Sequence, residues 1–220
     1  MIQTLSKEKE NKMSNRFVKI PINYFDELSK EVQEKIIESE LGQSFASFDA
    51  DCSIKYILDE WGEKLYNLGF ENSEILYNIG FSQGDGACFT TKYVNLLKLA
   101  QAYNRIFNLV GEKDEDSLAC LNIEINQSGR YSHENSIYCH IEYNSYNDED
   151  EFLDEEIEDL ERAILSIAKE LSREIYKEMS ESVLGCYDPE NIAEGIRAND
   201  CIFDSLGNCM NRYESILEEE

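Results

Sequence analysis

The feature that most constrains the fold is an apolar stripe running through the most acidic part of the chain. Residues 147–161 include ten Asp and Glu residues, yet apolar residues recur through this segment and beyond it at intervals of three or four. Such intervals place side chains on one face of a helix, and acidic first turns agree with the helix dipole. We expect a long acidic helix packed on a sheet, with a helix–helix contact as the alternative. The stripe consists of Leu153, Ile157, Leu160, Ile164, Ile167, Leu171 and Ile175.

Alternation of apolar and polar residues marks the expected strands. In residues 74–82, for example, every second residue from Ile75 to Phe81 is apolar, which is typical of a strand with one buried face. Four such segments predict an antiparallel sheet of about four strands. They are Glu74–Ser82, Ala87–Thr91, Ser117–Asn126 and Ser136–Tyr146.

Helix signals occupy much of the remaining chain. Ser29 can cap a first helix that Gly42 stops, and Gly69 can end a second helix. Together with the strands, these helices predict the α+β class, with an antiparallel sheet packed against helices that include the long acidic one. The further expected helices cover 52–68, 93–110 and 190–217, and a short edge strand is expected over 17–22.

The length and composition suit one folded domain. The 220 residues are 42% apolar and include 13 Tyr and 10 Phe, which is unlike a disordered chain and sufficient for one sizeable core. We expect residues 1–15, which are polar and lysine-rich, to be a flexible N-terminus. Residues 16–220 are expected to form a single α+β domain.

The net charge restricts the classes of partner. Forty-six acidic residues against 20 Lys and Arg give a formal charge of −26, which repels polyanions and disfavours direct binding to DNA or RNA. The same charge suits a basic protein surface, including the nucleic-acid-binding cleft of another protein; plain solubility is the alternative. The expected contact residues are Asp148, Glu149, Asp150, Glu151, Asp154, Glu155 and Glu158.

The cysteines and hydropathy exclude several other classes. The seven cysteines are odd in number and no two have CxxC spacing, so zinc-finger and thioredoxin-like folds are not expected. The acidic cluster has no histidine at metal-binding spacing, and we expect neither a metal nor a cofactor. No apolar run approaches the roughly 18 residues of a membrane span, and no signal peptide is recognisable. These features predict a cytoplasmic protein whose cysteines stay reduced.

The segment Gly80–Phe89, with the sequence GFSQGDGACF, concentrates glycines and polar residues. It lacks the GK[ST] of a P-loop and the third glycine of a dinucleotide fingerprint. Gly84 and Gly86 permit positive φ and close backbone approach, and Asp85 can accept local backbone hydrogen bonds, so a tight structural turn is one interpretation. The alternative is a pocket for a small anionic ligand such as a nucleotide signal, lined by Gln83, Asp85, Arg130 and His133.

A cysteine-dependent enzyme is a third alternative. To act as a nucleophile, Cys88 needs a neighbouring base and a lowered thiol pKa, which His133 and Asp85 could supply if their two loops meet. No recognised cysteine-hydrolase motif surrounds Cys88, and a cysteine beside Phe89 in a strand usually belongs to the core. We therefore assign no catalytic residue and favour a non-enzymatic protein.

Three segments resemble a known family when they are taken in order: FDELS at 25–29, YNIGFSQGDGACF at 77–89 and GRYSH at 129–133. They are similar to uncharacterised phage and prophage accessory proteins with an SQGDGACF-like motif, which are sometimes labelled antitoxin-like. The resemblance spans about Phe25 to Tyr143. It implies a phage protein that acts on host machinery in the bacterial cytoplasm, and it implies no reaction.

The charge and the resemblance together favour a phage-type binding protein without enzymatic activity. Its expected partner is a basic host protein, from a defence system or from nucleic-acid handling, that is inhibited by an acidic surface in the manner of a DNA mimic. The expected alternatives are a small anionic ligand at the SQGDGACF turn and cysteine-dependent catalysis.

Overall fold

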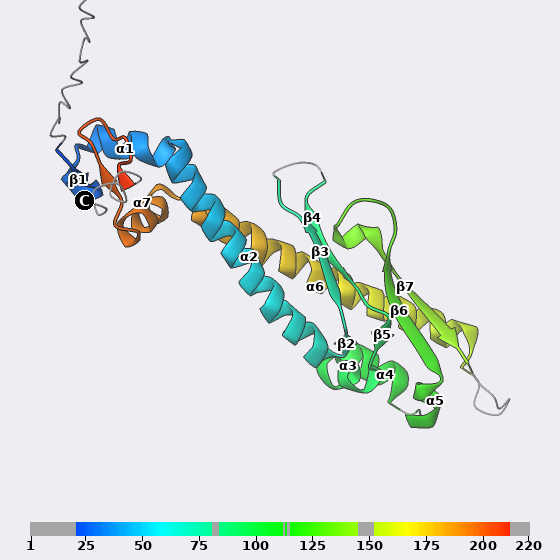
Figure 1. Ribbon diagram of the computed structural model, residues 1–220. Helices are drawn as coiled ribbons and strands as arrows, with labels where there is room; N and C mark the ends of the chain where they lie inside the picture. The colour runs from blue at the N-terminus through cyan, green and yellow to red at the C-terminus, as the bar shows by residue number, and fades with distance from the viewer. Residues whose placement is uncertain (1–20, 81–83, 112, 114, 145–151, 212–220) are drawn as a thin grey trace, which may run out of the picture. The chain divides into compact units, whose positions relative to one another are not determined.

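The computed structural model describes residues 21–80, 84–111, 113, 115–144 and 152–211 (Figure 1). The chain divides into two compact units, one formed by Met1–Gly42 with Ala193–Glu220 and the other by Gln43–Ile192. The single domain expected over 16–220 stays a prediction, and the N-terminus expected over 1–15 lies outside the described residues.

The larger unit consists of helices and short antiparallel strands, which confirms the predicted α+β class. Helix α2 (Glu40–Leu68) leads into the strands, and the long helix α6 (Asp154–Cys186) follows them. The elements between them are β2 (Phe70–Glu71), β3 (Glu74–Asn78), β4 (Gly86–Thr90), β5 (Tyr93–Val94), α3 (Leu96–Ala102), α4 (Asn104–Val110), α5 (Glu115–Ala119), β6 (Leu121–Gln127), the 3-10 helix η2 (Glu134–Ser136) and β7 (Ile137–Tyr143).

The strands form two main hairpins that are joined at one point. Strand β3 pairs with β4, and β6 pairs with β7 over seven residue pairs; both pairings are antiparallel. A single bridge links Thr91, just after β4, to Ile125 in β6. Their amides donate to each other's carbonyl oxygens at 3.0 and 2.8 Å. The predicted antiparallel strands are therefore present, although two-stranded sheets replace one continuous sheet.

Helix α6 packs on the strands and also contacts α2. Its strand contacts are with β4 and β7. In the second half of α6, the indole N–H of Trp61 on α2 donates to Glu178 at 2.8 Å, while Lys64 lies 3.5 Å from Glu174. A residue further along α2 thus meets one further back along α6, so the two helices run antiparallel (Figure 1). The expected packing of α6 on the strands is therefore present, and polar side chains of the same helix contact α2.

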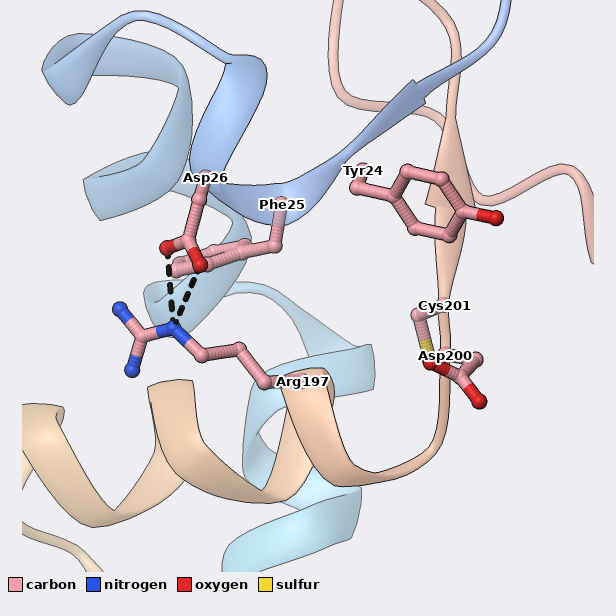
Figure 2. A pocket seen from close by; sticks show the side chains of 6 residues that line it. All are labelled: Tyr24, Phe25, Asp26, Arg197, Asp200 and Cys201. Atoms are coloured by element: carbon pink, nitrogen blue, oxygen red, sulfur yellow. Dashed lines mark hydrogen bonds and ion pairs between the residues drawn. The ribbon is translucent and has the colours of Figure 1, made fainter.

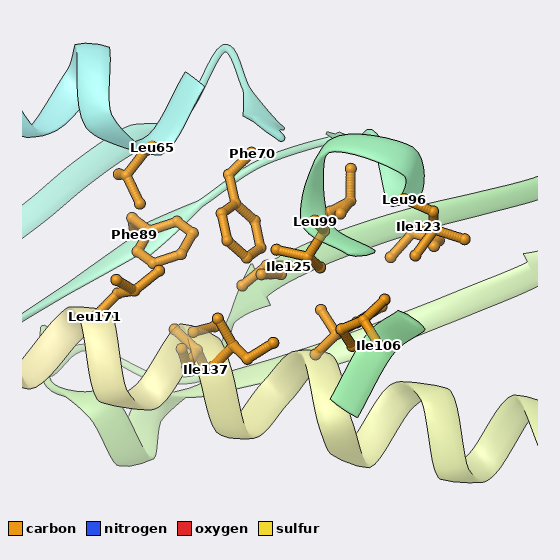
Figure 3. Close-up of a cluster of buried hydrophobic side chains, with 14 of the residues drawn as sticks. Leu65, Phe70, Phe89, Leu96, Leu99, Ile106, Ile123, Ile125, Ile137 and Leu171 are labelled. Atoms are coloured by element: carbon orange, nitrogen blue, oxygen red, sulfur yellow. The ribbon is translucent and has the colours of Figure 1, made fainter. Parts of the chain in front are cut away.

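A single hydrophobic core joins these elements, as Figure 3 shows. The rings of Phe70 and Phe89 meet edge to face, with centroids 5.1 Å apart. Leu65 of α2 and Leu171 of α6 lie on either side of Phe89 in this view. Ile125 brings β6 into the same cluster, and all five side chains are buried.

The smaller unit brings together segments from the two ends of the described chain. Strand β1 (Asn23–Tyr24) pairs with β8 (Ile202–Phe203), and the rings of Phe25 and Phe203 lie 6.4 Å apart. The 3-10 helix η1 (Phe25–Glu27) and α1 (Lys30–Glu38) follow β1, while α7 (Pro189–Ala198) precedes β8.

Several predicted helix boundaries are wrong. Gly42 does not stop a helix: α1 ends at Glu38, and α2 begins at Glu40 and includes Gly42 and Cys52. A Cβ atom at Gly42 would lie 2.2 Å from the carbonyl oxygen of Ile37, so glycine here permits a close approach between the two helices rather than a helix end.

Three further expected elements differ from the structure. Residues 93–110 are divided into β5, α3 and α4, with an extended residue, Tyr103, between the two helices. Residues 117–119, expected to start a strand, belong to α5, and α7 ends at Ala198 rather than continuing. Residues 17–20 of the expected edge strand and 212–217 of the last expected helix lie outside the described residues. None of the helices in the described part of the chain combines the length and the hydropathy of a membrane span.

Candidate functional site

The two loops that the sequence analysis singles out are in contact. Gly86 opens β4, and a Cβ atom built on it would lie 2.5 Å from the Cβ of His133 and 2.8 Å from the Ser132 carbonyl oxygen. A Cβ atom on Gly84 would lie 3.0 Å from the Tyr131 ring. Only glycine allows the β3–β4 turn to lie this close to residues 131–133. We call residues 84–86 and 130–133 the hairpin tips.

Asp85 holds the turn between β3 and β4. One of its carboxylate oxygens accepts a hydrogen bond from the Gly80 amide at 3.0 Å, and the other accepts from the Asn78 side-chain amide at 3.3 Å. These bonds match the interpretation of a structural turn. The expected positive φ is not found at Gly84 or Gly86; among the described glycines it occurs at Gly69, Gly129 and Gly207.

Tyr131 is the centre of the second loop. The Arg130 guanidinium lies over the Tyr131 ring at 4.9 Å and donates to its hydroxyl at 2.7 Å. The imidazole of His133 stacks on the same ring with centroids 6.4 Å apart, and its Nδ1 accepts from the Asn135 amide at 3.0 Å. The loop is therefore ordered by its own contacts, which leave Tyr131 46% exposed.

The predicted ligand residues are thus only partly brought together. Residues Asp85, Arg130 and His133 belong to two loops in contact, and each has a polar partner within its own loop region. Gln83 lies outside the described residues. Ligand binding by these four residues stays a prediction.

Cys88 is built as a core residue. It is fully buried in β4, where burial raises the pKa of its thiol even though the Ser136 hydroxyl, 3.9 Å away, acts in the opposite direction. A thiol with a raised pKa is protonated at neutral pH and is a poor nucleophile. The environment of Cys88 therefore does not support catalysis.

Alkylation provides a direct test of this environment. Iodoacetamide is expected to modify the exposed Cys52 about a hundredfold or more faster than Cys88, because Cys88 reacts only after local unfolding. Peptide mapping by mass spectrometry over time measures both rates in one sample. Comparable rates in the folded protein, followed by no further increase in urea, would contradict the buried, protonated thiol.

The first turns of α6 form the second candidate site. Asp154, Glu155 and Glu158 are exposed, and none of them makes an ion pair within the described part of the chain. We call these three residues the acidic patch. The other predicted contact residues, Asp148, Glu149, Asp150 and Glu151, lie outside the described residues.

Neighbouring acids of α6 have structural partners instead. Glu156 accepts from the Leu153 amide at 3.1 Å and pairs with Lys113 at 3.1 Å. These two interactions lower the pKa of Glu156, the backbone hydrogen bond having the larger effect. Asp159 pairs with Arg162 one turn later. On the described part of α6, the acids without such a partner are therefore those of the acidic patch.

The family model for a domain of unknown function, DUF8835, matches residues 45–184. This match covers more than half of the chain. The chain belongs to this family. The matched residues fall within the larger unit, Gln43–Ile192, so the DUF8835 domain corresponds to that unit and contains the hairpin tips and the acidic patch. No curated protein and no solved structure matches the chain.

The DUF8835 domain also carries a polar pocket that no sequence pattern indicates. Its volume is about 340 Å³, and its walls include Asn72, Glu74, Lys92 and Tyr93. Asn72 has a positive φ of 53°, a conformation that asparagine tolerates in turns. The walls offer charges of both signs and amide groups, which suit hydrogen bonding to a small polar molecule. No motif marks these four residues, because they come from two separate segments of the chain, 72–74 and 92–93.

A second pocket lies in the smaller unit, outside the DUF8835 match. Figure 2 shows the Arg197 guanidinium facing Asp26, and both residues line the pocket. Arg197 Nε donates to the two carboxylate oxygens of Asp26 at 2.9 and 3.1 Å. The pocket has a volume of about 230 Å³. Its facing residues are 171 positions apart, so sequence spacing could not identify them. Among the described residues of the whole chain, no group of three or more His, Cys, Asp or Glu could hold a metal ion.

Proposed function

We propose that this chain is a non-enzymatic binding protein that inhibits a basic bacterial protein through its acidic surface. The observation that carries the proposal is the acidic patch, three exposed carboxylates without ion pairs at the start of α6, in a chain of net charge −26. The buried, protonated state of Cys88 also favours a binding role over the enzymatic alternative.

The proposed mechanism is competition for a basic surface. A dense field of carboxylates attracts Lys and Arg side chains and accelerates encounter with a basic partner. A protein that handles DNA or RNA presents such a surface to phosphates, and a bound acidic protein would occupy it. The resemblance of residues 25–143 to phage accessory proteins supports a bacterial target, such as a defence protein, and a phage origin. We include both in the proposal.

Capture from a bacterial lysate tests the proposal when the charge of the acidic patch is varied. The immobilised chain is expected to retain basic nucleic-acid-binding proteins at about 0.1 M salt and to release them at about 1 M, where the Debye length falls from about 10 Å to about 3 Å. The variant D154N/E155Q/E158Q should capture about tenfold less, because each exposed ion pair contributes about 0.2–1 kcal/mol. Quantitative mass spectrometry measures the captured proteins.

The matched control removes the same charge elsewhere. Glu31, Glu34 and Glu38 are exposed on α1, and E31Q/E34Q/E38Q changes the formal charge by the same three units. This control should capture as much as wild type, and duplex DNA should displace the captured proteins. If both variants captured equally less protein than wild type, net charge alone would explain the capture and the acidic patch would not be the contact. If neither variant captured less, the proposal would be overturned.

A further inference from the structure

The outward face of α2 carries large apolar side chains where charged ones are expected. Phe48 is 66% exposed, Tyr56 is 68% exposed and Tyr66 is 51% exposed. These residues lie within one stripe of the helix surface, because each four-residue step advances the position by only about 40° around the axis. We call the whole row the outer stripe. It consists of Phe48, Cys52, Tyr56, Asp59, Glu63 and Tyr66.

The outer stripe lies opposite the face that α2 buries. Ile57, Trp61 and Leu65 are buried and face the core and α6. A helix with apolar residues on both sides is usually covered on both sides. Within the described residues, the outer stripe has one such contact, from Lys98 Nζ over the Tyr66 ring at 4.1 Å, whereas Phe48 and Tyr56 stay exposed. The comparable outward positions of α6, such as Glu170, Arg173 and Lys177, carry charges. The outer stripe therefore differs from an ordinary solvated helix face.

We infer that the outer stripe binds an amphipathic basic helix of a partner protein. Its first half presents Phe48, Cys52 and Tyr56 at i, i+4 and i+8, which is the spacing that a helix lying along α2 would contact with its apolar face. Its second half presents Asp59 and Glu63 toward the Lys and Arg residues of that helix. The inference rests on the proposed function in one respect, the basic nature of the partner.

Charge also argues against a second copy of the chain as the occupant. Two chains of −26 repel each other at long range. A parallel self-contact along the outer stripe would bring Asp59 and Glu63 near the same acids of the other copy, and like-charge juxtaposition in an interface is costly. The Lys and Arg residues of a basic helix would instead attract Asp59 and Glu63.

The test uses a defined probe, a fluorescent amphipathic helical peptide of Leu and Lys, with a Leu and Glu peptide of the same pattern beside it. Fluorescence anisotropy measures the Kd of each for the full chain. The Lys peptide should bind the wild type and should bind F48S/Y56S about tenfold or more weakly, because exposed aromatic anchors dominate such contacts. The matched control F107S removes another exposed aromatic, 56% exposed on α4, and should leave the Kd unchanged.

Three outcomes would overturn the inference. The first is equal binding of the Lys peptide by wild type and F48S/Y56S. Both proteins have the same charge, so this result would mean that the peptide is attracted by charge alone and not by the aromatic side chains. The second is equal binding of the Glu peptide. The third is a wild-type dimer in sedimentation experiments that F48S/Y56S converts to monomer. The lysate capture with D154N/E155Q/E158Q tests the proposed function separately, since that variant leaves the outer stripe intact.

Discussion

Phe89→Ala is expected to lower the free energy of unfolding by about 3–5 kcal/mol, the range for truncating a fully buried aromatic. Phe89 has no exposed surface, and its ring meets Phe70 edge to face. Figure 3 places it between Leu65 of α2 and Leu171 of α6. Because four elements converge on this ring, they are not expected to close the cavity that alanine leaves.

Urea denaturation followed by tryptophan fluorescence measures this loss. Trp61 is the single tryptophan of the chain and is buried in the same core, so its emission reports the unfolding of the DUF8835 domain. The control Phe107→Ala, at an exposed position, should change stability by no more than about 0.5 kcal/mol. If Phe89→Ala cost no more than this control, the central position of Phe89 would be wrong.

The sequence predicts the helices and strands that bury one face, because their apolar residues recur at regular intervals. The stripe from Leu160 to Ile175 is buried in α6 as expected, and the alternation in 121–127 gives the buried and half-buried faces of β6. These patterns are visible because each element buries one side. The long α2 was harder to delimit, since its outer stripe is also apolar and its Gly42 resembles a stop signal.

The parts that depend on distant segments could not be predicted. No glycine or proline near Tyr103 predicts the break between α3 and α4. The β1–β8 pairing and the contact of Asp26 with Arg197 join opposite ends of the described chain. Such pairings depend on packing, which a single sequence does not display.

The candidate site shows the same division. The interpretation of Asp85 as a residue that holds a turn follows from local hydrogen-bonding chemistry, and the structure places two such bonds on it. The sequence predicts positive φ and a close backbone approach at Gly86. The close approach is present, but to a segment about 47 residues later in the chain that the local pattern does not identify, and the positive φ is not found. A glycine that makes room for another segment has no local signature that separates it from a turn glycine.

Gly86→Ala is expected to lower the free energy of unfolding by about 2–3 kcal/mol, as overpacking of a tight contact does. The added methyl group would lie 2.5 Å from the His133 Cβ and 2.8 Å from the Ser132 carbonyl oxygen. The backbone of this segment is held by further hydrogen bonds. For example, the Ser136 hydroxyl donates to the His133 carbonyl oxygen at 2.7 Å. The loops must therefore separate to admit the methyl group.

The matched control is Gly62→Ala in α2, where an added Cβ meets nothing within 4 Å. This change should raise stability by about 0.5–1 kcal/mol, because alanine is the better helix former. Urea denaturation of both variants measures the change in the free energy of unfolding, which should be negative for Gly86→Ala and positive for Gly62→Ala. Amide hydrogen exchange over 128–136 should accelerate in Gly86→Ala alone. If Gly86→Ala were as stable as wild type with unchanged exchange, the hairpin tips would not be held together at Gly86. Asp85 would then no longer be held close to Arg130 and His133, and the two loops would not form the shared surface that the predicted ligand site requires.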